Sequence, residues 1–241
     1  MRVQRMNKLA IFTEGQTEQI FAEWLVLSLG DVAQVAIRVE RVIGGRRGEA
    51  RRITEISGTS EGAGHEFFVL IVDCGQDERV KSDILDRYDR LISAGYKHII
   101  GIRDLFPHSR DDVGRIRDGF VFKLPVEPVK PALILAIMEA EAWFLAEYSH
   151  FPRIHADLTI DRIQRELGFD PVNDDMQLRD RPSKDLEDIY FLETINYHKA
   201  RAHVERTVSC LDLAIMQHQV ATRIHDLGDL VKQIQTFFNA R

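Results

Sequence analysis

The chain has 241 residues, of which 44% are hydrophobic and 29% are charged, and its formal net charge is −6. This length and composition favour one globular domain, or one domain with a helical extension, built on a core of ordinary size. The negative charge argues against a protein that coats nucleic acid through general positive charge. It leaves room for a nuclease whose metal site is acidic and whose basic groups lie on one face.

The N-terminal residues Met1–Lys8 are polar and the apolar run after them is short, so no signal peptide is predicted. No apolar run has the length that a membrane span needs. Two cysteines, Cys74 and Cys210, are too few for a disulfide framework. We therefore expect a cytoplasmic protein that has no membrane partner.

Residues 9–29 predict a buried strand, a tight turn and an amphipathic helix. Gly15 lets the backbone turn, so Glu14 stands at the carboxyl end of the strand and Glu18 in the first turn of the helix. Ligands bind at this edge of open α/β sheets, and two carboxylates there suit magnesium. The alternative is that Glu18 only favours the helix N-terminus and Glu14 is simply exposed.

A glycine-rich basic turn follows a second predicted strand, Val35–Ile43. The arginines of this turn, and of a helix predicted to run from it to about Ser57, are Arg46, Arg47, Arg51 and Arg52. They are candidates for gripping a phosphate backbone, together with the helix N-terminus. A solvated basic turn explains them equally well. The turn is not a P-loop, because no Gly-Lys-Ser/Thr follows the glycines.

The middle of the chain alternates strands with helices. Phe67–Val72 is continuous and apolar, as a buried parallel strand is, and it ends at Asp73. The other predicted strands here are His98–Ile102, an edge strand at Gly119–Leu124, and Leu133–Met138. The predicted helices are Glu78–Ser93, a short helix or lid at Ser109–Arg117, and one that begins at Trp143.

After Ser149 the apolar spacing is helical, at Leu158–Leu167, Lys184–Leu192, Lys199–Leu211 and Asp229–Phe238. The sequence therefore predicts an α/β domain at residues 1–148 and a helical C-terminal extension at 149–241 that packs on it. The sheet of the first domain is expected to be mainly parallel and flanked by helices, because strands and helices alternate.

Four predicted strands end in or beside an acid: Glu14, Asp73, Asp104 and Glu139. Right-handed crossovers bring the carboxyl ends of parallel strands to one edge of the sheet, so these side chains are expected to converge. Burying several carboxylates together is costly unless a cation compensates. Oxygen ligands without a Cys/His pattern favour Mg²⁺ or Mn²⁺. For any single acid, a cap or turn role is at least as good an explanation.

The octet Ile11–Glu18, an apolar strand followed by Glu-Gly-x-Thr-Glu and an amphipathic helix, resembles the opening of the TOPRIM-like fold. That fold occurs in topoisomerases, primases, overcoming-lysogenization-defect (OLD) nucleases and smaller bacterial families, many of them linked to phage defence. Three further segments resemble TOPRIM-related bacterial families: Met138–Trp143 (MEAEAW), Pro182–Lys184 (PSK) and Tyr197–Lys199 (YHK).

The resemblance implies a role in metal binding or acid–base chemistry for Glu14, and it matches Glu18 to a second glutamate of the OLD-like branch. Asp73 falls where that fold usually carries Asp-x-Asp, but position 75 is glycine here. Asp77 or Asp104 are the candidates to replace the missing aspartate. The resemblance also implies a partner ATPase, since the related families often occur beside one and this chain has no ATP-binding motif.

The leading hypothesis is a metal-dependent nuclease, with catalytic residues Glu14, Asp73 and Lys184 and metal ligands Glu14, Glu18, Asp73, Asp104 and Glu139. A metal-bound water would attack the phosphodiester, and Lys184, or else Lys199, would neutralise the developing charge. The alternative is a non-catalytic binding or sensor subunit, which the broken Asp-x-Asp favours. A receiver-type phosphotransfer domain ranks last, because Leu133–Met138 has no lysine. DNA or RNA as substrate and homo-oligomer formation stay open.

Overall fold

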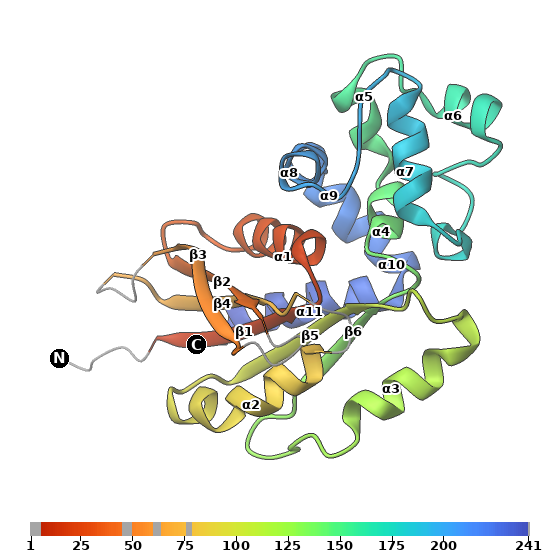
Figure 1. The fold of residues 1–241 in the computed structure, drawn as a ribbon. Helices are drawn as coiled ribbons and strands as arrows, with labels where there is room; N and C mark the ends of the chain where they lie inside the picture. Colours follow the sequence, from red (N-terminus) through yellow and green to blue (C-terminus); the bar gives the residue numbers. More distant parts are fainter. Residues whose placement is uncertain (1–5, 45–49, 60–63, 76–78, 241) are drawn as a thin grey trace. The chain divides into compact units, whose positions relative to one another are not determined.

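The computed structural model describes residues 6–44, 50–59, 64–75 and 79–240 (Figure 1). Arg46, Arg47 and Asp77, which the sequence singles out, lie outside these ranges. Among the described residues, no helix combines the length and the apolar character that crossing a membrane requires.

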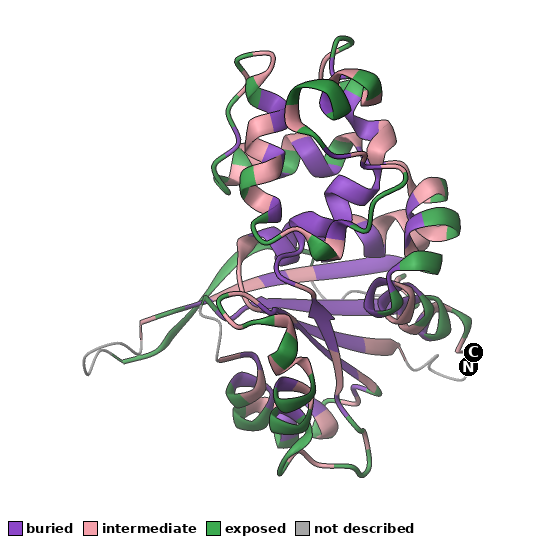
Figure 2. Cartoon of the chain, turned by 90° about the vertical axis from the view of Figure 1, so that its right-hand side faces the viewer, coloured by how far each residue is buried: buried purple, intermediate pink, exposed green. Residues whose placement is uncertain are grey.

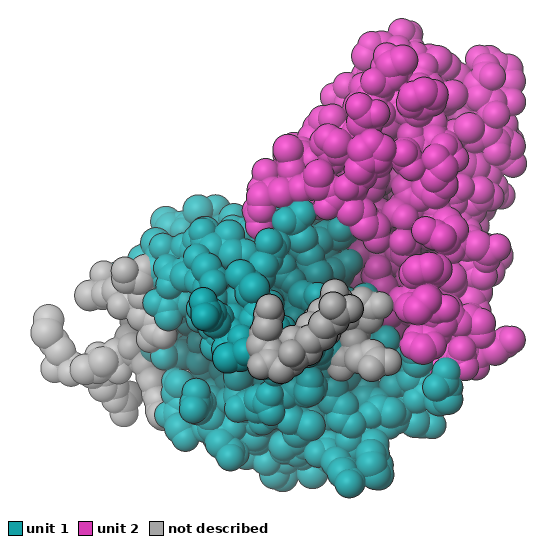
Figure 3. Space-filling view, in the orientation of Figure 1, with its two compact units in different colours: residues 1–103, 114–134, 232–241 teal, residues 104–113, 135–231 magenta. Residues whose placement is uncertain are grey.

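Two compact units make up the chain, and neither is continuous in sequence. Unit 1 comprises Met1–Arg103, Gly114–Ile134 and Lys232–Arg241, and unit 2 comprises Asp104–Val113 and Leu135–Val231, coloured separately in Figure 3. The domain boundary predicted at residue 148 lies inside unit 2.

A six-stranded sheet of order β3-β2-β4-β1-β5-β6 forms the α/β part of the chain. Its strands are β1 (Asn7–Thr13), β2 (Val35–Ile43), β3 (Arg52–Gly58), β4 (Phe67–Asp73), β5 (His98–Asp104) and β6 (Ala132–Ala136). The β2–β4, β4–β1 and β1–β5 pairs are parallel, and the β2–β3 pair is antiparallel. The expectation of a mainly parallel sheet flanked by helices is thereby confirmed.

The strands with the most apolar side chains form the buried centre of the sheet. All seven residues of β4 are buried, as its continuous apolar sequence predicts, and the strands in the middle of the sheet are largely purple in Figure 2. Phe12 of β1 and Phe68 of β4 belong to one core cluster with Val80 and Ile84 of α2 (Arg79–Ser93). Helix α1 (Gln16–Leu29) follows β1 and buries Phe21, along with other apolar side chains.

Two predicted elements are wrong. Residues 52–58, expected in a helix, form the antiparallel edge strand β3, whose β-branched Ile53, Thr54 and Ile56 suit a strand beside β2. The segment Gly119–Leu124, expected as an edge strand, forms the end of helix α3 (Val113–Val121) and the turn after it; α3 follows the 3₁₀ turn η1 (Arg110–Asp112). Ile116 and Phe120 are four residues apart, so one helical face buries both of them.

Unit 2 is helical from α4 onwards, and its described residues after Ser149 form no strand, as expected. Its elements are α4 (Glu141–Ala146), η2 (Tyr148–His150), α5 (Phe151–Ile154), α6 (Ile160–Leu167), η3 (Met176–Leu178), α7 (Pro182–Phe191), α8 (Arg201–Cys210), α9 (Leu213–Ile215), the π-helical η4 (Met216–Val220) and α10 (Ala221–Arg223). Helix α11 (His225–Asn239) begins in unit 2 and ends in unit 1.

The two thiols of the chain are expected to differ sharply in reactivity. Burial raises the pKa of Cys74, directly after β4, to about 12, whereas Cys210 is partly exposed. Because the thiolate is the reacting species, Cys74 should be modified only as fast as the protein opens. A Cys210→Ser variant should therefore react slowly with a disulfide reagent and a Cys74→Ser variant quickly. Fast labelling of Cys210→Ser would contradict the buried position of Cys74.

Candidate functional site

The carboxyl ends of β1 and β4 lie side by side in unit 1. The parallel register pairs Thr13 with Asp73, and the Cys74 amide donates a hydrogen bond to the Thr13 carbonyl at 2.9 Å. Glu14 is the next residue after Thr13, so it leaves the sheet at the strand end next to the one that carries Asp73. The sheet thus places two of the predicted ligands at neighbouring strand ends, although they are far apart in the sequence.

Asp73 is a buried carboxylate that an arginine neutralises. Its side chain is 3% exposed, and Oδ2 lies 2.6 Å from Nε of Arg41, the residue opposite it in β2. The other oxygen accepts the Gly75 amide at 2.9 Å. The same arginine donates from Nη2 to Oε1 of Gln16 at 3.1 Å. The Arg41 guanidinium offsets the cost of burying this carboxylate.

Glu18 is also buried, in the first turn of α1. One of its oxygens accepts the Gly15 amide at 2.9 Å, a capping interaction that gives Glu18 a structural role at the helix N-terminus. Gly15 has an extended backbone with φ of −152°, so the turn does not require the special freedom of glycine. Glu14 is half-buried.

In unit 2, Asp104 and Glu139 are buried beside the start of α4. Asp104 Oδ1 accepts the amide of Ala140 at 2.9 Å, so this aspartate holds the turn that enters the helix. Glu139 accepts both the amide and the hydroxyl of Ser183, at 2.8 and 2.9 Å. Both carboxylates therefore have structural partners within unit 2.

The Lys199 ammonium joins two buried glutamates. Its Nζ lies 3.1 Å from Oε1 of Glu139 and 3.2 Å from Oε2 of Glu141, whose other oxygen accepts the Tyr197 hydroxyl at 2.9 Å. Oε2 of Glu141 lacks a well-angled hydrogen bond, so its attraction to Lys199 is mainly electrostatic. Through these contacts the MEAEAW, PSK and YHK segments, which are separate in sequence, meet at one cluster.

Charge and backbone geometry both distinguish this cluster. Burial acts to raise the pKa of Glu139, but the Lys199 charge and the hydrogen bonds from Ser183 and Lys199 together outweigh it, so the pKa lies below its ordinary value. Met138 and Lys199 have φ of 62° and 39°, in the left-handed region that residues other than glycine rarely occupy. Such strain persists only where surrounding contacts enforce it.

The second predicted lysine, and not the first, contacts the predicted acids. Lys184 Nζ lies 3.0 Å from Glu187 and 2.9 Å from Asp188, both on its own helix α7, and its side chain is 56% exposed. Lys184 ranks before Lys199 in the sequence-based prediction, but the short motifs that end in these lysines carry no information on which lysine reaches the acids. The role of Lys184 in catalysis stays a prediction.

Arg51 forms ion pairs with two aspartates of α2. Its guanidinium pairs with the buried Asp83 and lies 3.1 Å from Asp86. Arg52 is the exposed first residue of β3. A nucleic-acid phosphate would therefore have to compete with two carboxylates for Arg51.

The structure thus defines an α/β protein with a mostly parallel sheet and with acids at the ends of its strands. Within the described ranges, one group of three potential metal ligands has all its ligand atoms within 4.8 Å of one another, and it consists of His155, Asp157 and Glu193. The sequence did not point to this group. Comparisons with protein-family models, with curated proteins and with solved structures gave no match to the chain.

Proposed function

We propose that this chain is a metal-dependent nuclease of TOPRIM-like fold, in which Glu14, Glu18 and Asp73 hold Mg²⁺ or Mn²⁺. The proposal rests on the register that pairs Thr13 with Asp73, since it sets Glu14 and Asp73 at neighbouring carboxyl ends of parallel strands. Ligands of open α/β sheets bind at this edge, and carboxylate oxygens suit a hard cation. The bound ion would supply Lewis acidity toward water and toward the phosphate.

The residues of this edge have specific tasks in the proposal. Asp73 already pairs with the Arg41 guanidinium, so a cation bound there would replace one positive partner with another. The Arg41 side chain is 34% exposed, so its guanidinium would be free to bind a phosphate oxygen in place of Asp73 if that aspartate held a metal. Gln16, which accepts from Arg41, would hold the arginine near the edge during this exchange.

Other features of the hypothesis remain proposals. Asp104 and Glu139 are proposed as further ligands, Lys184 as a charge-neutralising group, and Arg46, Arg47, Arg51 and Arg52 as contacts to the nucleic-acid backbone. An effector role in phage defence and a partner ATPase rest on the resemblance alone.

The test is cleavage of DNA and RNA by the pure chain with Mg²⁺ or Mn²⁺. We expect cleavage that a chelator stops and that Asp73→Asn abolishes, because the substituted amide is a weaker ligand without charge. Asp86→Asn is the matched control: Asp86 is an aspartate of unit 1 that also pairs with an arginine, but it is exposed on α2. Equal activity of Asp73→Asn and Asp86→Asn would refute the proposed site.

A second candidate is a non-catalytic binding or sensor subunit that works with a partner ATPase. The Arg41–Asp73 ion pair favours it, because an internal cation already neutralises the acid that a metal would need. The glycine at position 75, in place of the second aspartate of Asp-x-Asp, points the same way. Absence of cleavage with every divalent metal, in a chain that stays folded, would favour this candidate.

A further inference from the structure

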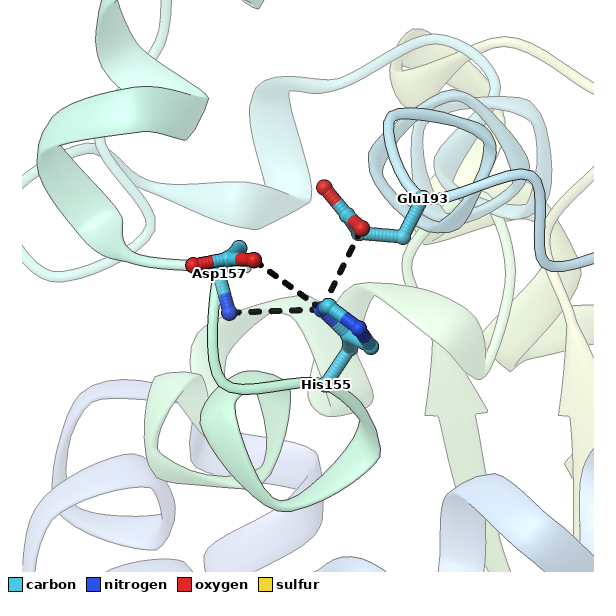
Figure 4. A group of neighbouring side chains, drawn as sticks. All are labelled: His155, Asp157 and Glu193. Carbon is cyan, nitrogen blue, oxygen red and sulfur yellow. Dashed lines mark hydrogen bonds and ion pairs between the residues drawn. The ribbon is translucent and has the colours of Figure 1, made fainter.

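We propose that His155, Asp157 and Glu193 form a binding site for a divalent transition metal, with Zn²⁺ as the best-suited ion. His155 and Asp157 both lie in the loop between α5 and α6, and Glu193 follows α7, so two short segments of unit 2 supply the three ligands. Their side chains turn toward one another in Figure 4. The site shares no residue with the proposed nuclease edge and does not depend on it.

The three ligand atoms lie within 4.8 Å of one another, which approaches the spacing in a metal's coordination shell. Nδ1 of His155 lies 3.3 Å from Oε2 of Glu193 and 3.8 Å from Oδ2 of Asp157. Zinc bonds of roughly 2.0–2.2 Å in a tetrahedron place neighbouring ligand atoms about 3.3–3.6 Å apart. The longer separation involves Asp157, whose side chain is 72% exposed and therefore able to adjust.

The chemistry of the ligands selects the ion. One imidazole nitrogen and two carboxylate oxygens form a borderline donor set, which zinc and its neighbours prefer over magnesium. The Asp157 amide donates to His155 Nδ1 at 3.3 Å, so this nitrogen carries its lone pair in this arrangement, and a bound metal would take that lone pair over from the amide. Three protein ligands at an exposed position leave the fourth place to water or to a substrate group.

Arg162 holds the glutamate and the loop in position. Its guanidinium binds Oε1 of Glu193, which leaves Oε2 directed at His155. It also donates to the carbonyls of Asp157 and Leu192, at 3.2 and 2.9 Å. One side chain of α6 thereby fixes both segments that carry the carboxylates, in the way that outer partners orient metal ligands.

The experiment is zinc titration of the chelator-stripped full chain by calorimetry, with bound metal counted by elemental analysis. We expect one zinc whose affinity falls at least tenfold in His155→Ala and in Glu193→Gln, since even outer partners of metal sites contribute roughly 10–100-fold. Cobalt should give a visible ligand-field band that the same variants lose. Circular dichroism will check that the variants remain folded. Asp157→Asn should weaken zinc binding less than the other two substitutions, because Asp157 is the most exposed of the three ligands.

His225→Ala is the matched control. His225 Nδ1 lies 3.4 Å from Oδ2 of Asp229 on an exposed helical face, but among the described residues the two form a pair and not a group of three ligands. This variant should keep the zinc, and so should Asp73→Asn, which affects only the proposed nuclease edge. The inference is overturned if the parent takes up no zinc, which would leave His155 as a partner of two carboxylates only. Retention of full affinity by His155→Ala, or its loss in His225→Ala or Asp73→Asn, would equally overturn it.

Discussion

Replacing Lys199 with methionine is expected to destabilise unit 2 by about 3 kcal/mol at neutral pH, near the lower end of the range for breaking a buried ion pair. Glu139 and Glu141 would keep their hydrogen bonds from Ser183 and Tyr197 but would lose their shared cation. The side chains of these glutamates are 5% and 0% exposed, so water cannot replace the ammonium well. The 41% exposure of Lys199 itself moderates the loss.

The measurement is urea unfolding followed by tryptophan fluorescence in a Trp24→Phe background. The chain has two tryptophans, and Trp143 then reports on unit 2 alone. Lys184→Met is the matched control, because Lys184 also contacts two carboxylates but does so on the surface of α7. It should change the unfolding midpoint little. An equal shift in both variants would mean that the Lys199 cluster contributes no more than a surface pair.

The difference between the parent and Lys199→Met should shrink in acid. The pKa of Glu139 in the folded parent lies below its ordinary value of 4.5, so its ion pair contributes stability above that pH and loses it as the pH falls through the folded-state pKa. In the variant the carboxyl binds a proton more readily, because the lysine charge no longer opposes it. Unfolding curves at pH 7 and near pH 4 will measure the convergence, and a gap independent of pH would contradict it.

Truncating Trp143 to alanine is expected to cost about 3–5 kcal/mol of the unfolding free energy. Trp143 is fully buried in α4, a helix in which all six residues are buried, so no exposed side can relax into the space left behind. The lost apolar contacts and the cavity both act against the folded state. Because the substitution removes the reporter, circular dichroism replaces fluorescence as the readout.

Phe191→Ala provides the comparison for this substitution. Phe191 is an aromatic residue of the same unit at the end of α7, but 64% of it is exposed. Its truncation should change the stability by roughly 0.5 kcal/mol or less, as for most surface sites. Similar losses in the two variants would show that α4 is not the centre of the unit 2 core.

Hydrophobic periodicity predicts those elements whose burial dominates their local sequence. The apolar run of β4 predicts a buried strand because it is continuous and is too short for a typical helix. The alternation of strands with helices predicts the parallel pairing of β4 with β1. Strand β3 leaves no such signal, since all seven of its residues are exposed. Its conformation depends on the hydrogen bonds that the edge of β2 offers, which is tertiary information.

The same distinction applies to the sites. The rule that parallel strands share a carboxyl edge places Glu14 beside the end of the strand carrying Asp73, but it cannot reveal that Arg41 pairs with that aspartate, because the pairing follows from the β2–β4 register. Likewise, the motif that ends in Lys199 is visible in the sequence while its contact with Glu139 is not. The His155 group has no sequence pattern at all, since the turn after α7 supplies its third ligand.

Unit 1 is assembled from segments that the sequence of unit 2 interrupts, and this has a consequence for folding during synthesis on the ribosome. The side-chain amide of Asn7 donates to the carbonyl of Ala240 at 2.6 Å, and the ring of Phe237 packs against Phe67 and His98, with centroids 5.3 and 5.7 Å away. The part of the sheet that α11 covers therefore stays exposed while the whole of unit 2 is translated. Nascent chains of this protein should therefore be prone to aggregate until α11 has been synthesised. During that interval they should depend on a chaperone that binds exposed apolar surface.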